Sequence, residues 1–117
     1  MSYVFDVGDV TVWSPSLRVG NLYVRIVSGI SEVLEIPTGL HPLASDFYDI
    51  DIDVFEHFVR AMFDLYVSAS HDILKSMIEG VMLPSLVMLD RAGRGIIPTT
   101  TAEAAILSKA SELSMAR

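Results

Sequence analysis

The residues best able to do chemistry lie in an acidic segment from Asp46 to Glu56, which holds five carboxylates and neither lysine nor arginine. Asp49, Asp51 and Asp53 alternate with isoleucines, so an extended backbone would project all three carboxylates from one side. Such a row of oxygens suits a hard cation or a basic partner. We call this segment the acidic hinge, because it separates two apolar helical patterns.

Metal binding is not favoured by the spacing around the acidic hinge. A calcium loop of the helix-loop-helix type also begins D-x-D-x-D, but Val54 stands where that loop needs glycine for its sharp turn. Arg60 stands where the loop ends in glutamate. The three histidines are scattered, whereas zinc requires closely spaced ligands on one face. We therefore expect neither a metal site nor a cofactor.

Acid/base catalysis has one candidate set, which is formed by His57, Asp53 and Asp51. Asp53 precedes His57 by four residues, so on a helix its carboxylate could accept the ring N–H and fix one tautomer. However, the spacings from Glu56 to Arg60 and from Arg60 to Asp64 are typical of ion pairs on a solvated helix face. The favoured interpretation is a solvated, helix-capping segment, and catalysis is the alternative.

An adaptable apolar cleft is a further hypothesis, because thioethers and aromatic rings conform to ligands of irregular shape. More often such side chains form the core. Taken together with the hinge carboxylates, the residues expected to bind a ligand or partner are Asp46, Asp49, Asp51, Trp13, Met62 and Tyr66.

Charge and composition restrict the partners. The net charge of -7 opposes binding to a phosphate backbone, so we expect no nucleic acid. Hydrophobic residues make up 51% of the chain, and the mean hydropathy is +0.48. This load is high for one short soluble chain, which predicts apolar surface used outside a monomer core, in a homodimer interface or an apolar pocket.

Cellular location is predicted from what the sequence lacks. It has no cysteine, as is common in a reducing cytoplasm. The opening residues do not form a signal peptide, and no stretch approaches the about eighteen apolar residues of a membrane span. We expect a cytoplasmic protein that does not bind membranes.

Local patterns predict the elements that position these residues. Period-two alternation on either side of Gly8-Asp9 predicts a β-hairpin. Ser14-Pro15 then predicts the start of a helix, whose apolar stripe from Val19 to Leu34 we expect to be buried. Residues 37–46 lack any period and predict a loop.

A second, longer helix is predicted from Asp53 to Ala92, capped by Asp53 with Glu56 and bent at Pro84. Thr100 and Glu103 repeat the capping spacing ahead of a third helical pattern. The predicted fold is mainly α, an N-terminal β-hairpin packed on a three- to four-helix bundle. We expect one helical domain over residues 1–98 and a C-terminal helical tail over 99–117, which either docks or frays.

Two stretches, FDVGDVTVWSPS and LEIPTGLHPLASDFYDID, followed by a long helical pattern, resemble a group of small bacterial proteins classed only as a domain of unknown function. The resemblance extends over about residues 1–93 and implies one compact domain. It implies no activity, cofactor or ligand.

Two hypotheses of function follow. The first is a small acidic binding protein, homodimeric, that engages a basic partner or an apolar ligand through the acidic hinge and the adjoining helical cleft. The alternative is a small cofactor-free enzyme, such as an isomerase or cyclase for an apolar metabolite, with His57 or a hinge aspartate as the acid/base group. The sequence does not decide whether the protein is an enzyme.

Overall fold

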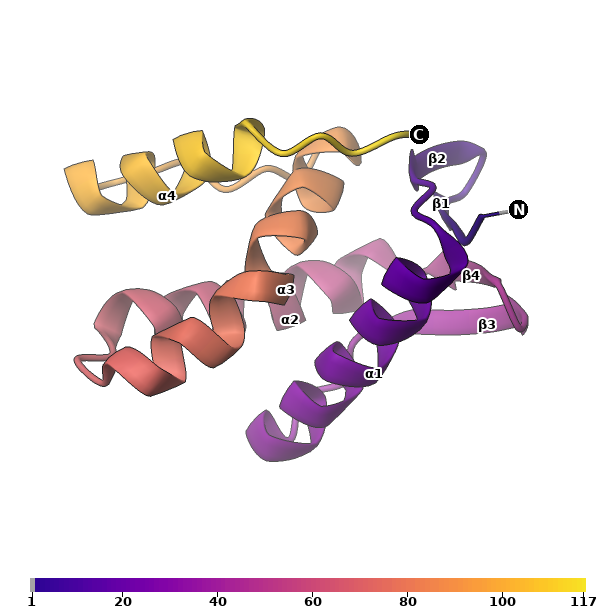
Figure 1. Cartoon of the computed structure of the whole chain (residues 1–117). Helices are drawn as coiled ribbons and strands as arrows, with labels where there is room; N and C mark the ends of the chain where they lie inside the picture. The colour runs from indigo at the N-terminus through magenta and orange to yellow at the C-terminus, as the bar shows by residue number, and fades with distance from the viewer. Residues whose placement is uncertain (1) are drawn as a thin grey trace.

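A computed structural model describes residues 2–117, in which four helices and a four-stranded sheet pack together (Figure 1). In chain order the elements are β1 (Val4–Val7), β2 (Val10–Trp13), α1 (Leu17–Leu34), β3 (Leu40–Ala44), β4 (Phe47–Ile50), α2 (Ile52–Ser68), α3 (Asp72–Arg91) and α4 (Thr101–Ser111).

The sheet has the strand order β2-β1-β4-β3 and is built from two hairpins that flank α1 in the sequence. The hairpins join through β1 and β4, which run parallel, whereas β1–β2 and β3–β4 are antiparallel. This arrangement is an α+β mix. It corrects the mainly α prediction. It also corrects the loop predicted over residues 37–46, because β3 lies within that range.

The predicted N-terminal hairpin is confirmed. Gly8 has φ of +58°, which glycine adopts without strain. The register places Phe5 beside Trp13 on one side and Tyr48 on the other. The three rings stack with centroids 5.6–5.7 Å apart, and Tyr23 of α1 packs edge-on against Phe5. This aromatic cluster fixes α1 on the sheet.

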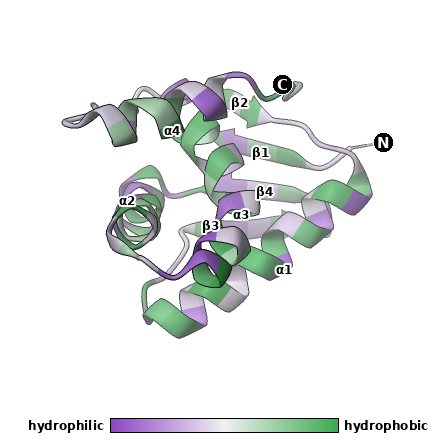
Figure 2. Cartoon of the chain, turned by 60° about the vertical axis from the view of Figure 1, so that its left-hand side comes forward, coloured by the Kyte–Doolittle hydropathy of each residue, from purple (hydrophilic) through white to green (hydrophobic). Residues whose placement is uncertain are grey.

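Helix α1 begins two residues later than predicted, because Ser16, not Ser14, accepts from the Val19 N–H. Tyr23 and Val27 face the core. At Gly20 an added Cβ would collide with the ring of Tyr3, so only glycine permits this close approach of helix and strand. Figure 2 shows α1 beside the sheet, with hydrophobic residues spread over much of its circumference.

The long helix predicted from Asp53 to Ala92 is two helices. Helix α2 ends at Ser68, and α3 restarts after His71, whose ring Nδ1 accepts from the Leu74 N–H. The two helices fold back and pack side by side (Figure 1). Ser68, Ser70 and His71 disfavour helix only mildly, and Ala69 favours it. Because the segment contains neither proline nor glycine, the break carried only a weak sequence signal.

Helix α3 continues through Pro84, as predicted, and its ribbon bends along its length (Figure 1). Pro84 cannot donate to the Gly80 carbonyl, which loosens the helix at that turn. In the next position the Ser85 hydroxyl donates to the Val81 carbonyl at 2.7 Å.

Helix α4 packs across α3, and the segment after it returns to the sheet (Figure 1). Thr100 caps α4 as predicted, by accepting from the Glu103 N–H. The guanidinium of Arg91 donates to the carbonyls of Val12 and Met115, so it ties the C-terminal segment to β2. Within residues 2–117, no helix is long and apolar enough to cross a membrane.

Candidate functional site

The acidic hinge leads into α2, and two of its carboxylates pair with an arginine distant in sequence. Asp51, not Asp53, is the N-cap, and its carboxylate accepts from the Val54 N–H. Asp53 and Glu56 point to the connector between α3 and α4, where Nη1 of Arg94 donates to both at 3.0 and 2.7 Å. The predicted Asp53–Glu56 capping box is therefore wrong, because both side chains instead form ion pairs with Arg94.

Glu56 is the centre of this ion-pair cluster. It also accepts from Nε of Arg60 one helical turn later, at 3.3 Å. The hydrogen bond from Arg94 is the main reason that the pKa of Glu56 lies below its ordinary value, and the bond from Arg60 acts in the same direction. Glu56 is thus held charged by two cations that the chain itself supplies.

The predicted catalytic residues do not form a catalytic arrangement in the described part of the chain. His57 is exposed, and no hydrogen bond within residues 2–117 joins it to Asp53. Asp51 is used as a cap. The predicted alternation of three carboxylates also ends early, because the backbone turns helical at Ile52.

The other predicted binding residues separate from one another. Asp49 lies on β4 opposite His41 of β3, and Asp46 lies in the turn before β4. Met62 is fully buried in the core. Tyr66 is partly buried, and its hydroxyl donates to Glu79, which also accepts from Lys109 of α4. Both bonds lower the pKa of Glu79, and the bond from Lys109 has the larger effect. Together they join α2, α3 and α4.

Trp13 is the one predicted binding residue that lines an apolar cleft. This cleft, of about 340 Å³, lies between α1 and α3, and we call it the apolar groove. Its walls contain no charged side chain. They are formed by Trp13, Val19, Leu22, Tyr23, Ile26, Met77, Gly80, Val81 and Pro84.

The groove exists because α1 has two apolar faces and only one of them is buried. Tyr23 and Val27 enter the core, whereas Val19, Leu22 and Ile26 remain exposed. On the α3 side, Gly80 has no side chain to fill the space. The sequence pattern contained these residues, but it predicted their stripe as a single buried face.

Two further clefts are more polar. One, of about 330 Å³, lies between α3, α4 and the C-terminal segment and includes Arg91 and Arg117. The other lies on the opposite side of α1 and includes Arg25, Glu32 and Tyr48. None of the three clefts contains Asp51, Asp53 or His57.

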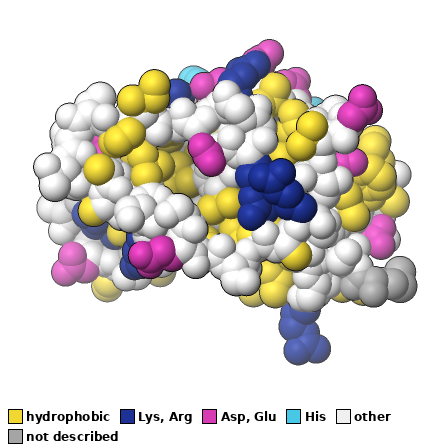
Figure 3. Space-filling view, turned by 90° about the horizontal axis from the view of Figure 1, so that it is seen from above, with side chains coloured by type: hydrophobic (Ala, Val, Ile, Leu, Met, Phe, Trp, Pro, Cys, Tyr) yellow, Lys and Arg dark blue, Asp and Glu magenta, His cyan; other side chains and the backbone are white. Residues whose placement is uncertain are grey.

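Acidic side chains are dispersed over the surface seen from above, where hydrophobic side chains form several small patches (Figure 3). Among residues 2–117, no group of three or more histidine and carboxylate side chains is placed to bind a metal ion.

Comparison with known proteins gives one match. A protein-family model described as a family of unknown function (DUF6086) matches residues 1–117. The match includes the segment after Gly93, so it extends beyond the resemblance found over about residues 1–93. No curated protein and no solved structure matches the chain.

Proposed function

The chain belongs to this family of unknown function (DUF6086), and we propose that it is a non-catalytic binding protein, which holds an apolar helical segment of a partner protein in the groove between α1 and α3. The single observation that carries the proposal is the apolar groove. Leu22 and Met77, on its two rims, are 57% and 69% exposed.

Exposure of such side chains is unfavourable in an isolated protein. Each square ångström of apolar surface that a partner removes from water contributes about 25 cal/mol to binding. Contiguous apolar patches on small proteins usually mark interaction sites, whereas single exposed residues carry no such meaning. Here the exposed residues are contiguous, because they line both walls of one groove.

The shape of the surface favours a helix over a small ligand. The exposed stripe of α1 extends from Val19 to Val33, which is about 21 Å along a helix axis. A drug-sized ligand would cover the groove but would leave the end of the stripe in water. An amphipathic helix, with anchors three and four residues apart, matches a long groove between two helices.

The acidic hinge has a secondary part in this proposal. Its carboxylates at Asp53 and Glu56 already bind Arg94, so a basic partner would have to compete with that arginine. Asp46 and Asp49 lie outside this cluster. Contact with a basic partner at the hinge and a cytoplasmic location both stay predictions.

Selection from a displayed library of amphipathic helical peptides tests the proposal. The emission of Trp13, the only tryptophan, reports binding in the groove that it lines. We expect selected peptides to shift this emission and to bind Leu22→Asp at least about tenfold more weakly, since a charge in the groove stays desolvated.

Leu43→Asp is the matched control, because Leu43 is equally exposed and apolar but lies on edge strand β3. It should bind the peptides as the wild type does. A selection that yields no binder, or binders equally tolerant of both substitutions, contradicts the proposal.

A further inference from the structure

We infer that the partner helix is α1 of a second copy of this chain, packed antiparallel to its counterpart about a two-fold axis near Ile26. This inference rests on the proposed function of the groove and assigns its occupant. The interface is isologous, so each α1 lies against the α1–α3 groove of the other protomer.

The apolar stripe of α1, which is exposed except at the partly buried Ile30, is symmetric in sequence about Ile26. Val19 and Val33 lie seven residues to either side, and Leu22 and Ile30 lie four residues to either side. When a second α1 runs in the opposite direction with Ile26 facing Ile26, each position n faces position 52 − n. Every residue of the apolar stripe then meets another residue of that stripe. A closed two-fold interface requires this kind of self-complementary surface.

The charges of α1 also match in the antiparallel orientation. Arg18 lies near the start of the helix, and Glu32 and Glu35 lie at its end. In the pairing about Ile26, Arg18 faces position 34 of the other copy, between those two glutamates. A parallel pairing would instead place like charges together, which is unfavourable.

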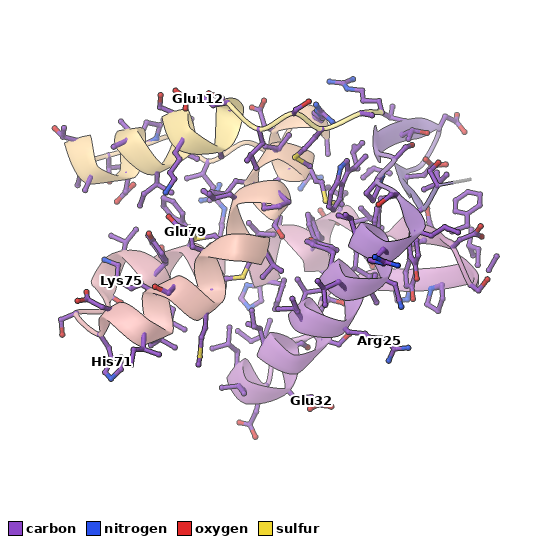
Figure 4. All side chains as sticks on the ribbon, in the orientation of Figure 1. Arg25, Glu32, His71, Lys75, Glu79 and Glu112 are labelled. Carbon is purple, nitrogen blue, oxygen red and sulfur yellow. The ribbon has the colours of Figure 1, made fainter. Side chains whose placement is uncertain are left out.

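The charged side chains lie on the flank of α1 beside the apolar stripe and outside the groove. Arg25 and Glu32 extend from the side of α1 that faces away from α3 (Figure 4). Arg18 shares this flank by helical spacing, since it lies seven residues before Arg25. Arg25, which is nearest the axis, already donates to Asn21 of its own helix at 3.2 Å.

A second copy covers apolar surface beyond the groove. Val33, at the end of α1, is 82% exposed, and Ile73, one turn before Met77 on α3, is 62% exposed. Neither residue lines the groove. An α1 helix of 18 residues is about 27 Å long, which exceeds the length of the stripe from Val19 to Val33.

Charge reversal gives the sharpest test. Arg18→Glu alone places glutamate against glutamate in both symmetric contacts, and Glu32→Arg alone places arginine against arginine. We expect each variant to dimerise at least about tenfold more weakly than the wild type. An equimolar mixture of the two restores opposite charges at both contacts, so it should form heterodimers.

Sedimentation equilibrium provides the measurement. Wild type should show twice the 12.8 kDa monomer mass, Leu22→Asp the monomer mass, and the Leu43→Asp control twice the monomer mass. Circular dichroism verifies that each variant is folded. Since Leu22 is exposed in a single copy, its replacement should leave the helix content unchanged.

The outcomes separate this inference from the proposed function. A monomeric wild type that binds selected peptides in the groove overturns the second copy as occupant and leaves the groove as a site for another protein. A dimer that persists in Leu22→Asp, or charge-reversed variants that fail to combine, also overturns it. Dimerisation that follows the charge pattern supports it.

Discussion

Tyr23 and Ser85 share a buried hydrogen bond whose direction follows from their neighbours. Their oxygens are 2.7 Å apart, and the single proton of Ser85 goes to the Val81 carbonyl. Tyr23 must therefore be the donor to Ser85. Burial raises the pKa of the Tyr23 phenol far above its ordinary value, so the hydroxyl stays protonated.

This direction predicts unequal costs for the two deletions. Ser85→Ala leaves the Tyr23 hydroxyl buried without an acceptor and should lower the free energy of unfolding by about 1–3 kcal/mol. Tyr23→Phe leaves Ser85 bonded to Val81 and should cost about 0.5–1.5 kcal/mol. Urea denaturation measures both. In the double variant the cost should be less than the sum, and strict additivity would contradict the shared bond.

At the scale of elements, substitutions at two glycines of α1 test how closely the helix approaches Tyr3. Gly20→Ala puts a methyl group into the ring of Tyr3 on the N-terminal segment, and the strain should cost about 1–3 kcal/mol. Gly29 is the matched control, because a methyl group there meets nothing within 4 Å. Gly29→Ala should stabilise by up to about 1 kcal/mol.

Thermal unfolding at low protein concentration measures both glycine variants without a contribution from assembly. Substitutions with the same effect would show that α1 does not approach Tyr3 as described.

At the scale of the whole molecule, two glutamates connect the α2–α3 helix pair to the segment that follows α3. Glu56 binds Arg94 of the connector, and Glu79 binds Lys109 of α4. In both glutamates the folded pKa lies below the ordinary 4.5. Their contribution to stability is therefore fully present above pH 4.5 and is lost as the pH falls through the folded values.

The double variant Glu56→Gln/Glu79→Gln should accordingly lose stability at neutral pH and show a weaker decline on acidification. Urea midpoints above and below pH 4.5 measure this. Asp64→Asn is the control, since no ion pair within residues 2–117 includes Asp64. If the control changed the pH dependence as much as the double variant, the two pairs would not be its cause.

Much of the local structure could be predicted from sequence because its causes are local. The turn at Gly8, the cap at Thr100 and the helix through Pro84 each depend on residues within a few positions. The strands β3 and β4 were missed for the opposite reason. The pairing of β4 with β1 depends on a segment more than thirty residues away, and in β3 His41-Pro42 resembles loop sequence.

The sequence by itself determined that the chain carries more apolar surface than one small core needs, and that negative charge is concentrated between residues 46 and 56. Only the tertiary structure decided how each is used. Arg94, distant in sequence, pairs with Asp53 and Glu56 of the acidic hinge. The packing of α3 against one face of α1 leaves another face exposed as a groove. Periodicity identifies the apolar positions of a helix, but which of them are buried depends on where its neighbours pack.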